Sequence, residues 1–98
     1  MKIESGEIVI VVLHSPREKI WGIVQEISAA GVYIRGIDLN AFNEFVRSAQ
    51  NGEHLYGFSN IFFPMWRIER LSRDERDGDI PSLLDQFESR TGLRIEEI

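Results

Sequence analysis

The feature that most constrains the fold is the apolar run from Ile8 to Leu13, in which five of the six residues are β-branched. Both faces of such a strand are apolar, which is typical of a strand buried on both sides. The run is too short to span a bilayer, and it follows Glu4 and Glu7 instead of the basic flank of a signal peptide. We therefore expect a cytoplasmic protein without a membrane partner, built around this strand.

A second strand is predicted from Lys19 to Ser28, after a turn that contains Pro16. Gly22 lies inside this strand, where the missing side chain permits the sharp bend that a strand needs to wrap a small barrel. Alternation along the strand predicts which side chains share a face. One face carries Trp21, Ile23 and Ile27, and the other carries Ile20 and Val24.

A third strand, residues 32–37, follows the tight turn 29–31 and completes a meander. The apolar period then changes, and residues 40–50 predict a helix that Asp38 or Asn40 caps and that ends at Asn51 and Gly52. The apolar positions of this helix follow the spacing i, i+3, i+4 and i+7. They are Phe42, Phe45, Val46 and Ala49.

The β pattern returns at residues 58–63, the predicted fourth strand. Pro64 cannot donate a backbone hydrogen bond, so residues 64–66 are expected to form a tight one-turn corner. The fifth strand is predicted over residues 67–72, where polar and apolar side chains alternate. Five strands with an inserted helix are thus expected within residues 1–72.

The C-terminal third is expected to differ from this body. Residues 73–80 read as an acidic, mobile linker, and residues 81–98 as a helix with a tail. Ser82 begins a capping box, and Gly92 ends the predicted helix. Its apolar side chains are expected to dock either on this chain or on a neighbouring subunit. They are Leu83, Leu84 and Phe87.

Residues 7–72 resemble the Sm-like small-barrel family (the LSm/Hfq type), with the bent second strand and the corner before the fifth as shared features. The resemblance implies a mainly β, five-stranded, strongly bent Sm-like or SH3-like barrel that forms rings by pairing strands four and five. The family's RNA-binding motifs are missing. The turn 28–32 lacks the base-contacting Asn, and Ile34-Arg35-Gly36 lies on strand three, where the family carries this tripeptide on strand four.

Catalysis has little support in the sequence. The chain has no cysteine, and its two histidines, His14 and His54, have no partner at a spacing typical of catalysis. The acidic residues of segment 73–80 do not form a calcium loop, because Arg73 and Leu84 occupy the first and last ligand positions. No phosphate-binding glycine loop is present. We therefore expect no enzyme, no metal site and no cofactor.

The charge distribution disfavours nucleic acid. Residues 1–71 carry seven Lys/Arg and eight Asp/Glu, and residues 72–98 carry four and eight, giving net charges of −1 and −4. A nucleic-acid-binding domain normally has a positive surface. RNA binding through a non-standard site stays open as the alternative, with aromatic side chains for stacking and arginines for phosphate. The candidate contacts are Tyr33, Arg35, Trp66, Arg67 and Arg70.

The favoured function is a non-catalytic assembly or adaptor module that binds protein, including copies of itself. The aromatic content is high for a small core, so part of it is expected to meet another chain. Strand four offers an apolar edge with little charge, and strand five an edge with alternating charge. The candidate oligomer interface is Ile61, Phe62, Phe63, Arg67, Ile68 and Arg70.

Overall fold

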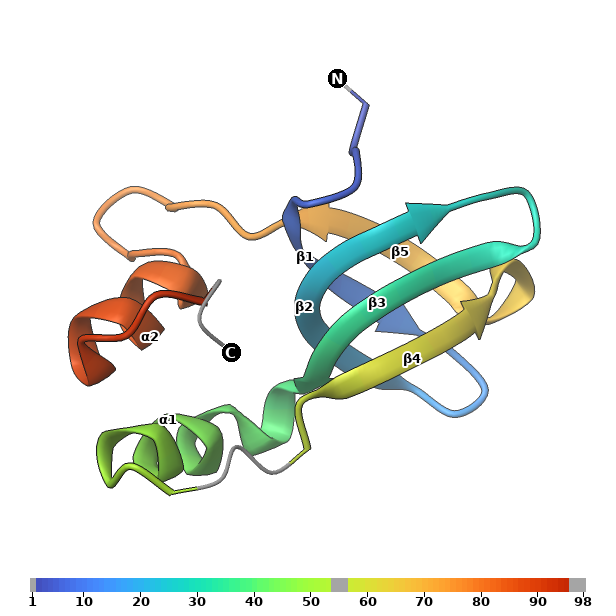
Figure 1. Ribbon diagram of the computed structural model, residues 1–98. Coiled ribbons are helices and arrows are strands. Elements are labelled where there is room, and N and C mark those ends of the chain that lie inside the picture. The colour runs from blue at the N-terminus through green and yellow to red at the C-terminus, as the bar shows by residue number, and fades with distance from the viewer. Residues whose placement is uncertain (1, 54–56, 96–98) are drawn as a thin grey trace.

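The computed structural model describes residues 2–53 and 57–95 and is mainly β, with five antiparallel strands in one unclosed sheet and two α-helices (Figure 1). The predicted number, type and order of these elements are confirmed, with boundaries shifted by at most two residues. The strands are β1 (Ile8–Leu13), β2 (Glu18–Ile27), β3 (Gly31–Asp38), β4 (Ser59–Pro64) and β5 (Ile68–Arg73). The helices are α1 (Phe42–Gln50) and α2 (Leu83–Thr91), with single 3-10 turns at η1 (Leu39–Ala41) and η2 (Met65–Arg67).

The strands follow the order β4-β3-β2-β1-β5 across the sheet. The chain passes from β3 to β4 through α1, and from β4 to β5 through η2, which is the predicted corner. The long strands β2 and β3 curve strongly, so that the sheet encloses an interior (Figure 1). The sheet therefore ends in two edge strands, β4 and β5, which directly follow one another in sequence.

A pair of glycines faces each other where β2 and β3 bend. Gly22 lies opposite Gly36 in the register of these strands. A Cβ atom on Gly36 would lie 2.4 Å from the carbonyl oxygen of Trp21, and one on Gly22 would lie 2.4 Å from that of Arg35. Both contacts are far too short, so the two backbones approach as closely as they do only because neither residue has a side chain.

One prediction about β2 is wrong. Ile27 does not share the face of Trp21, because the register shifts between Val24 and Glu26 and leaves Gln25 as an extra residue. Such a bulge reverses the alternation beyond it. Ile27 therefore pairs with Val32 and points into the interior of the sheet.

Two apolar clusters lie on the two faces of the sheet. The interior cluster is formed by strand residues alone: Val9, Val11, Leu13, Ile20, Val24, Val32 and Ile34. The outer cluster packs the sheet against both helices, and its buried members are Trp21, Ile37, Phe42, Phe45, Val46, Ala49, Phe58, Phe87 and Ile95. Because β1 contributes to both clusters, its burial on both faces is confirmed.

Trp21 is the centre of the outer cluster and is fully buried. The rings of Phe42 and Phe45 meet its indole edge-on, with centroids at 5.2 and 6.3 Å. Phe45 in turn stacks on Phe58 at 5.2 Å and on Phe87 at 5.3 Å. The predicted apolar face of the inserted helix is thus confirmed as core.

The C-terminal helix α2 packs on its own chain through Phe87, which is fully buried in the outer cluster, with Leu83 and Leu84 partly buried beside it. Asp74 holds the beginning of this helix. One carboxylate oxygen accepts from the backbone N–H of Leu83, and the other accepts from the N–H of Leu84 and from the indole Nε1–H of Trp21 at 3.0 Å.

The boundaries of α2 carry the predicted capping chemistry. Ser82 accepts from the backbone N–H of Asp85, and Gly92 ends α2 in the left-handed conformation. The predicted cap of α1 by Asp38 or Asn40 is wrong, because Asp38 accepts from the N–H of Asn40 and so caps η1, and α1 begins after Ala41 without a side-chain cap. The start of the predicted linker differs, because Arg73 is the last residue of β5. Residues 96–98 of the predicted tail, and residues 54–56 with His54, lie outside the described residues.

Candidate functional site

The edge strand β4 presents apolar side chains on both of its faces. Ile61 and Phe63 point into the interior, where both pack only partly against the interior cluster. Phe62 lies on the outer face, 40% exposed, and its ring packs at a tilt against that of the 46% exposed Tyr33 of β3, with ring centroids at 4.7 Å. An apolar strand edge of this kind is one that proteins normally protect.

The other edge strand, β5, has a similar interior face. Ile68 and Leu71 are partly buried against the same interior cluster. Its outer positions are polar: Arg70 lies exposed beside Val12 of β1, and Glu69 forms an ion pair with Arg17 at 3.4 Å. Both edges therefore leave interior apolar side chains half covered.

Arg67 serves the fold of its own chain. Its guanidinium lies 2.6 Å from the carboxylate of Glu18 and donates to the carbonyl oxygens of His14 and Pro16, and its side chain is only 13% exposed. It thereby ties the turn between β1 and β2 to η2. A guanidinium held this way is poorly placed to reach a phosphate.

The Ile34-Arg35-Gly36 tripeptide also has a structural explanation. Ile34 is buried in the interior cluster, and Gly36 is one of the two paired glycines. The guanidinium carbon of Arg35 lies 5.0 Å above the ring of Phe58, in a cation–π contact that covers the outer cluster. Each of the three residues thus supports the sheet itself.

Trp66 is the most exposed aromatic side chain among the described residues, at 65%. It lies on η2, and its ring meets that of His14 edge-on at 6.5 Å. Together with Arg70 on β5 and Tyr33 on β3, it places the exposed nucleic-acid candidates on three separate elements.

The described residues contain no group of three or more His, Asp or Glu side chains that could hold a metal ion. His14 contacts the hydroxyl of its neighbour Ser15 at 3.2 Å, and both residues are exposed in the turn after β1. In the part of the chain that the structure describes, no third group is placed to orient the imidazole as a base. The hydrogen bond between His14 and Ser15 is therefore interpreted as a local contact within the turn.

An ion pair fastens the N-terminal segment across one end of the sheet. The carboxylate of Glu7 accepts from Nε–H and from one terminal nitrogen of Arg73, and also from the backbone N–H of Glu4. The hydrogen bond from Arg73 holds the pKa of the Glu7 carboxyl below its ordinary value. Arg73 also donates to the carbonyl oxygen of Lys2 at 2.8 Å.

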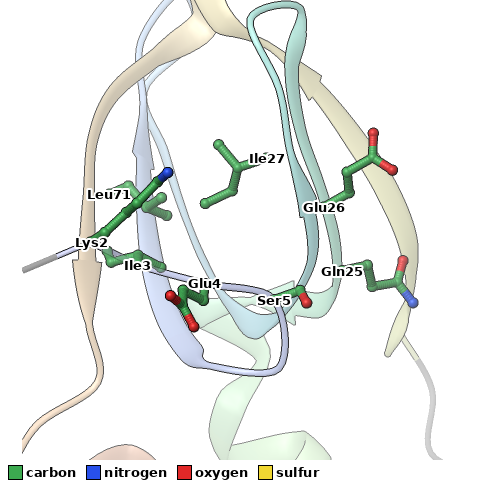
Figure 2. Close-up of a pocket in the computed structure, with 8 residues that line it drawn as sticks. All are labelled: Lys2, Ile3, Glu4, Ser5, Gln25, Glu26, Ile27 and Leu71. Carbon is green, nitrogen blue, oxygen red and sulfur yellow. The ribbon is translucent and has the colours of Figure 1, made fainter.

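Beneath this segment lies a pocket of about 660 Å³. Figure 2 shows Ile27 pointing into it, with Leu71 and Lys2 on the opposite side, whereas Gln25 and Glu26 point away from it. The full lining is Lys2, Ile3, Glu4, Ser5, Gln25, Glu26, Ile27 and Leu71. Sequence reasoning missed this pocket because the bulge at Gln25, which has no sequence signal, turns Ile27 inward.

Among the described residues, no helix is long and apolar enough to cross a bilayer. Comparison with protein-family models, with curated proteins and with solved structures finds no match for this chain. The edge strands and the pocket are therefore assigned from their geometry alone.

Proposed function

We propose that this protein is a non-catalytic assembly module with an Sm-like small-barrel fold, whose copies join head to tail by pairing β4 of one copy with β5 of the next. The observation that carries the proposal is the sheet order. Among the described residues, β4 pairs only with β3 and β5 pairs only with β1, which leaves one free edge at each end of the sheet.

The side chains at the two edges are complementary in type. The interior face of β4 carries Ile61 and Phe63, and that of β5 carries Ile68 and Leu71, all of them half covered within one chain. Pairing the two edges would extend the interior cluster from one copy into the next and remove this apolar surface from water.

The outer faces of the two edge strands carry different side chains that can form a favourable contact. Phe62 on β4 and Arg70 on β5 are both exposed. Across a paired edge, a guanidinium beside an aromatic ring gives a cation–π contact. Because the two edges are different, the contact is heterologous, and repeating it closes a ring when the rotation between copies permits.

Light scattering at micromolar concentration tests the proposal. We expect a mass that is a multiple of the 11.3 kDa chain. Phe62→Lys places a charge on the free edge and is expected to give monomers, as edge charges do in natural sheets. The matched control is Tyr33→Lys, which changes an equally exposed aromatic side chain on the same face but on an inner strand.

The control separates an edge contact from a face contact. If both variants dissociate the assembly equally, the contact involves the outer aromatic surface that Tyr33 and Phe62 share and is not specific to the edge of β4. A monomeric wild-type chain contradicts the proposal altogether. Circular dichroism of both variants confirms that they remain folded, which is expected because both positions are well exposed.

A further inference from the structure

We propose that three side chains on the outer face of the sheet, Glu26, Tyr33 and Phe62, together bind an arginine side chain from a basic segment of a partner protein. The guanidinium lies against the two rings and pairs with the carboxylate. Glu26 and Tyr33 stand on the inner strands β2 and β3, away from the edges through which copies are proposed to join. The inference therefore goes beyond that assembly and does not depend on it.

The register of the sheet places the three side chains in one row. Tyr33 of β3 lies opposite Glu26 of β2 on one side and opposite Phe62 of β4 on the other. The Cβ atoms of directly opposed residues lie about 4.5–5.5 Å apart, and their side chains share a face of the sheet. The bulge at Gln25 creates this row, because without it Gln25 would stand opposite Tyr33.

The two aromatic side chains leave ring surface open to a ligand. Their centroids lie 4.7 Å apart with the ring planes tilted by 46°. Tyr33 is 46% exposed and Phe62 is 40% exposed. An exposed ring face carries the negative part of the aromatic quadrupole, which attracts a cation. The pair is thus a surface that favours a positively charged group.

The carboxylate of Glu26 adds a full negative charge at the end of the row. Among residues 2–53 and 57–95, no hydrogen bond or ion pair engages this carboxylate. Its side chain is exposed and points away from the interior pocket (Figure 2). Arg35, on the same face of β3, is held over the ring of Phe58. The charge of Glu26 is therefore available to a cation from outside, and the net charge of −5 attracts a basic partner.

The order of groups in the row favours arginine over lysine. A guanidinium is planar, stacks on aromatic faces and forms two parallel hydrogen bonds with a carboxylate. The lysine ammonium is a compact and more strongly hydrated charge, which gains less from lying on a ring. Two rings followed by a carboxylate offer the guanidinium both of its preferred contacts at once.

The surface is held in place before a ligand arrives. The side-chain amide of Gln25 donates to Oδ1 of Asn60 at 3.1 Å. Since β3 lies between β2 and β4, this hydrogen bond crosses β3 beside the row and ties the two flanking strands together. A preorganised surface loses less conformational entropy on binding than a mobile one.

NMR titration of the full chain with a short peptide at low ionic strength tests the site. The probe is acetylated and amidated Gly-Thr-Arg-Thr-Gly, and the reference is the same peptide with citrulline, an uncharged side chain of similar shape. We expect shifts at the ring signals of Tyr33 and Phe62. The arginine peptide should bind about three- to thirtyfold more tightly than the citrulline peptide, the combined range of an exposed cation–π contact and an exposed ion pair. A lysine peptide should fall between the two.

Two variants with matched controls complete the test. Glu26→Gln should weaken the arginine peptide about two- to fivefold. Glu75→Gln, which removes the same charge from an exposed position after β5, should leave it unchanged. Tyr33→Leu keeps an apolar side chain but removes a ring, and it should lower the preference for arginine over citrulline. Trp66→Leu, at an exposed aromatic residue outside the row, should not.

Light scattering of the same samples keeps this proposal apart from the assembly. Because Glu26 lies on an inner strand, Glu26→Gln should have the same mass as the wild-type chain. A monomeric wild-type chain that binds the arginine peptide would contradict the assembly and support the arginine site.

Three outcomes overturn the proposal. The first is the absence of ring shifts at Tyr33 up to millimolar arginine peptide. The second is citrulline binding as tightly as arginine, or Glu75→Gln acting as strongly as Glu26→Gln, since either result leaves Glu26 without a specific role. The third is binding that occurs only in the Arg70→Ala variant, which would show that Arg70 of a neighbouring copy already occupies the row.

Discussion

At the scale of single residues, the paired glycines set the curvature of the sheet. Gly22 and Gly36 face each other across β2 and β3, and each stands where a Cβ atom would strike the opposite backbone. Gly22 was recognisable from the sequence as a glycine inside a strand. The structural role of Gly36 was not recognised from the sequence, because the Ile-Arg-Gly tripeptide was considered as an RNA-binding motif. In the structure, the glycine is the residue of the three whose backbone contact excludes a side chain.

The prediction at this scale is that Gly36→Ala destabilises the fold by about 1–3 kcal/mol, because the new methyl group would overpack a rigid backbone contact. Chemical denaturation monitored by circular dichroism measures the loss. The control is Ser72→Ala on β5, where no side-chain hydrogen bond is lost and a change within about 0.5 kcal/mol is expected. An unchanged midpoint for Gly36→Ala would show that β2 and β3 can separate without cost.

At the scale of elements, Asp74 joins the sheet to α2. Its carboxylate accepts from two N–H groups in the first turn of the helix and from Trp21, so it fixes where the helix begins and how it lies on the outer cluster. In the sequence, this residue is one of several acids in an apparent linker. Nothing local distinguishes it from Asp77 or Asp79, because its partners lie far along the chain.

We expect Asp74→Ala to cost about 2–3 kcal/mol, the sum of a lost helix cap and a lost hydrogen bond from a buried indole. Asp79→Ala, in the same acidic segment but exposed, is the control and should be nearly neutral. Thermal unfolding of both variants makes the comparison. Equal melting temperatures would mean that α2 docks without Asp74.

The helix α2 itself belongs to the core of the chain. Phe87 stacks on Phe45 and meets Trp21, all three of them fully or almost fully buried. Sequence reasoning identified the docking side chains of α2 but left open whether they dock on this chain or on a neighbouring subunit. The amphipathic pattern shows that a helix needs a partner surface, whereas it does not show which surface that is.

Phe87→Ala is therefore predicted to destabilise the whole fold by about 3–5 kcal/mol, as for a buried ring in a rigid core. Deleting residues 79–98 should expose Trp21 and shift its fluorescence to longer wavelength. A truncated chain that keeps the blue-shifted emission and a cooperative unfolding transition would show that the sheet and α1 form a complete core alone.

At the scale of the whole molecule, the patterns that repeat locally were predictable and the contacts between distant residues were not. Alternation and turn chemistry located every strand and the corner at Pro64. The bulge at Gln25 and the turn contacts of Arg67 depend on how strands lie beside one another. Both the pocket and the engagement of the Arg67 guanidinium within its own chain follow from such long-range geometry.

The charge of the whole molecule leads to the last prediction. With a net charge of −5 and with Arg35 and Arg67 engaged within the chain, we expect no submicromolar binding of short U-rich or A-rich single strands at physiological salt. Fluorescence anisotropy with labelled oligonucleotides measures this. Tight binding that disappears in Trp66→Ala and Arg70→Ala, but not in the exposed control Lys19→Gln, would restore the RNA hypothesis.

The placement of the two tryptophans also has a spectroscopic consequence. The side chain of Trp66 is largely exposed to solvent. Trp21 is fully buried in the outer cluster, and its indole N–H donates a hydrogen bond to the carboxylate of Asp74. Replacing Trp66 by Phe leaves a single emitter, whose nearest polar partner is the carboxylate that also anchors α2. In that variant, the emission of one indole reports directly whether the C-terminal helix is docked, without any added label.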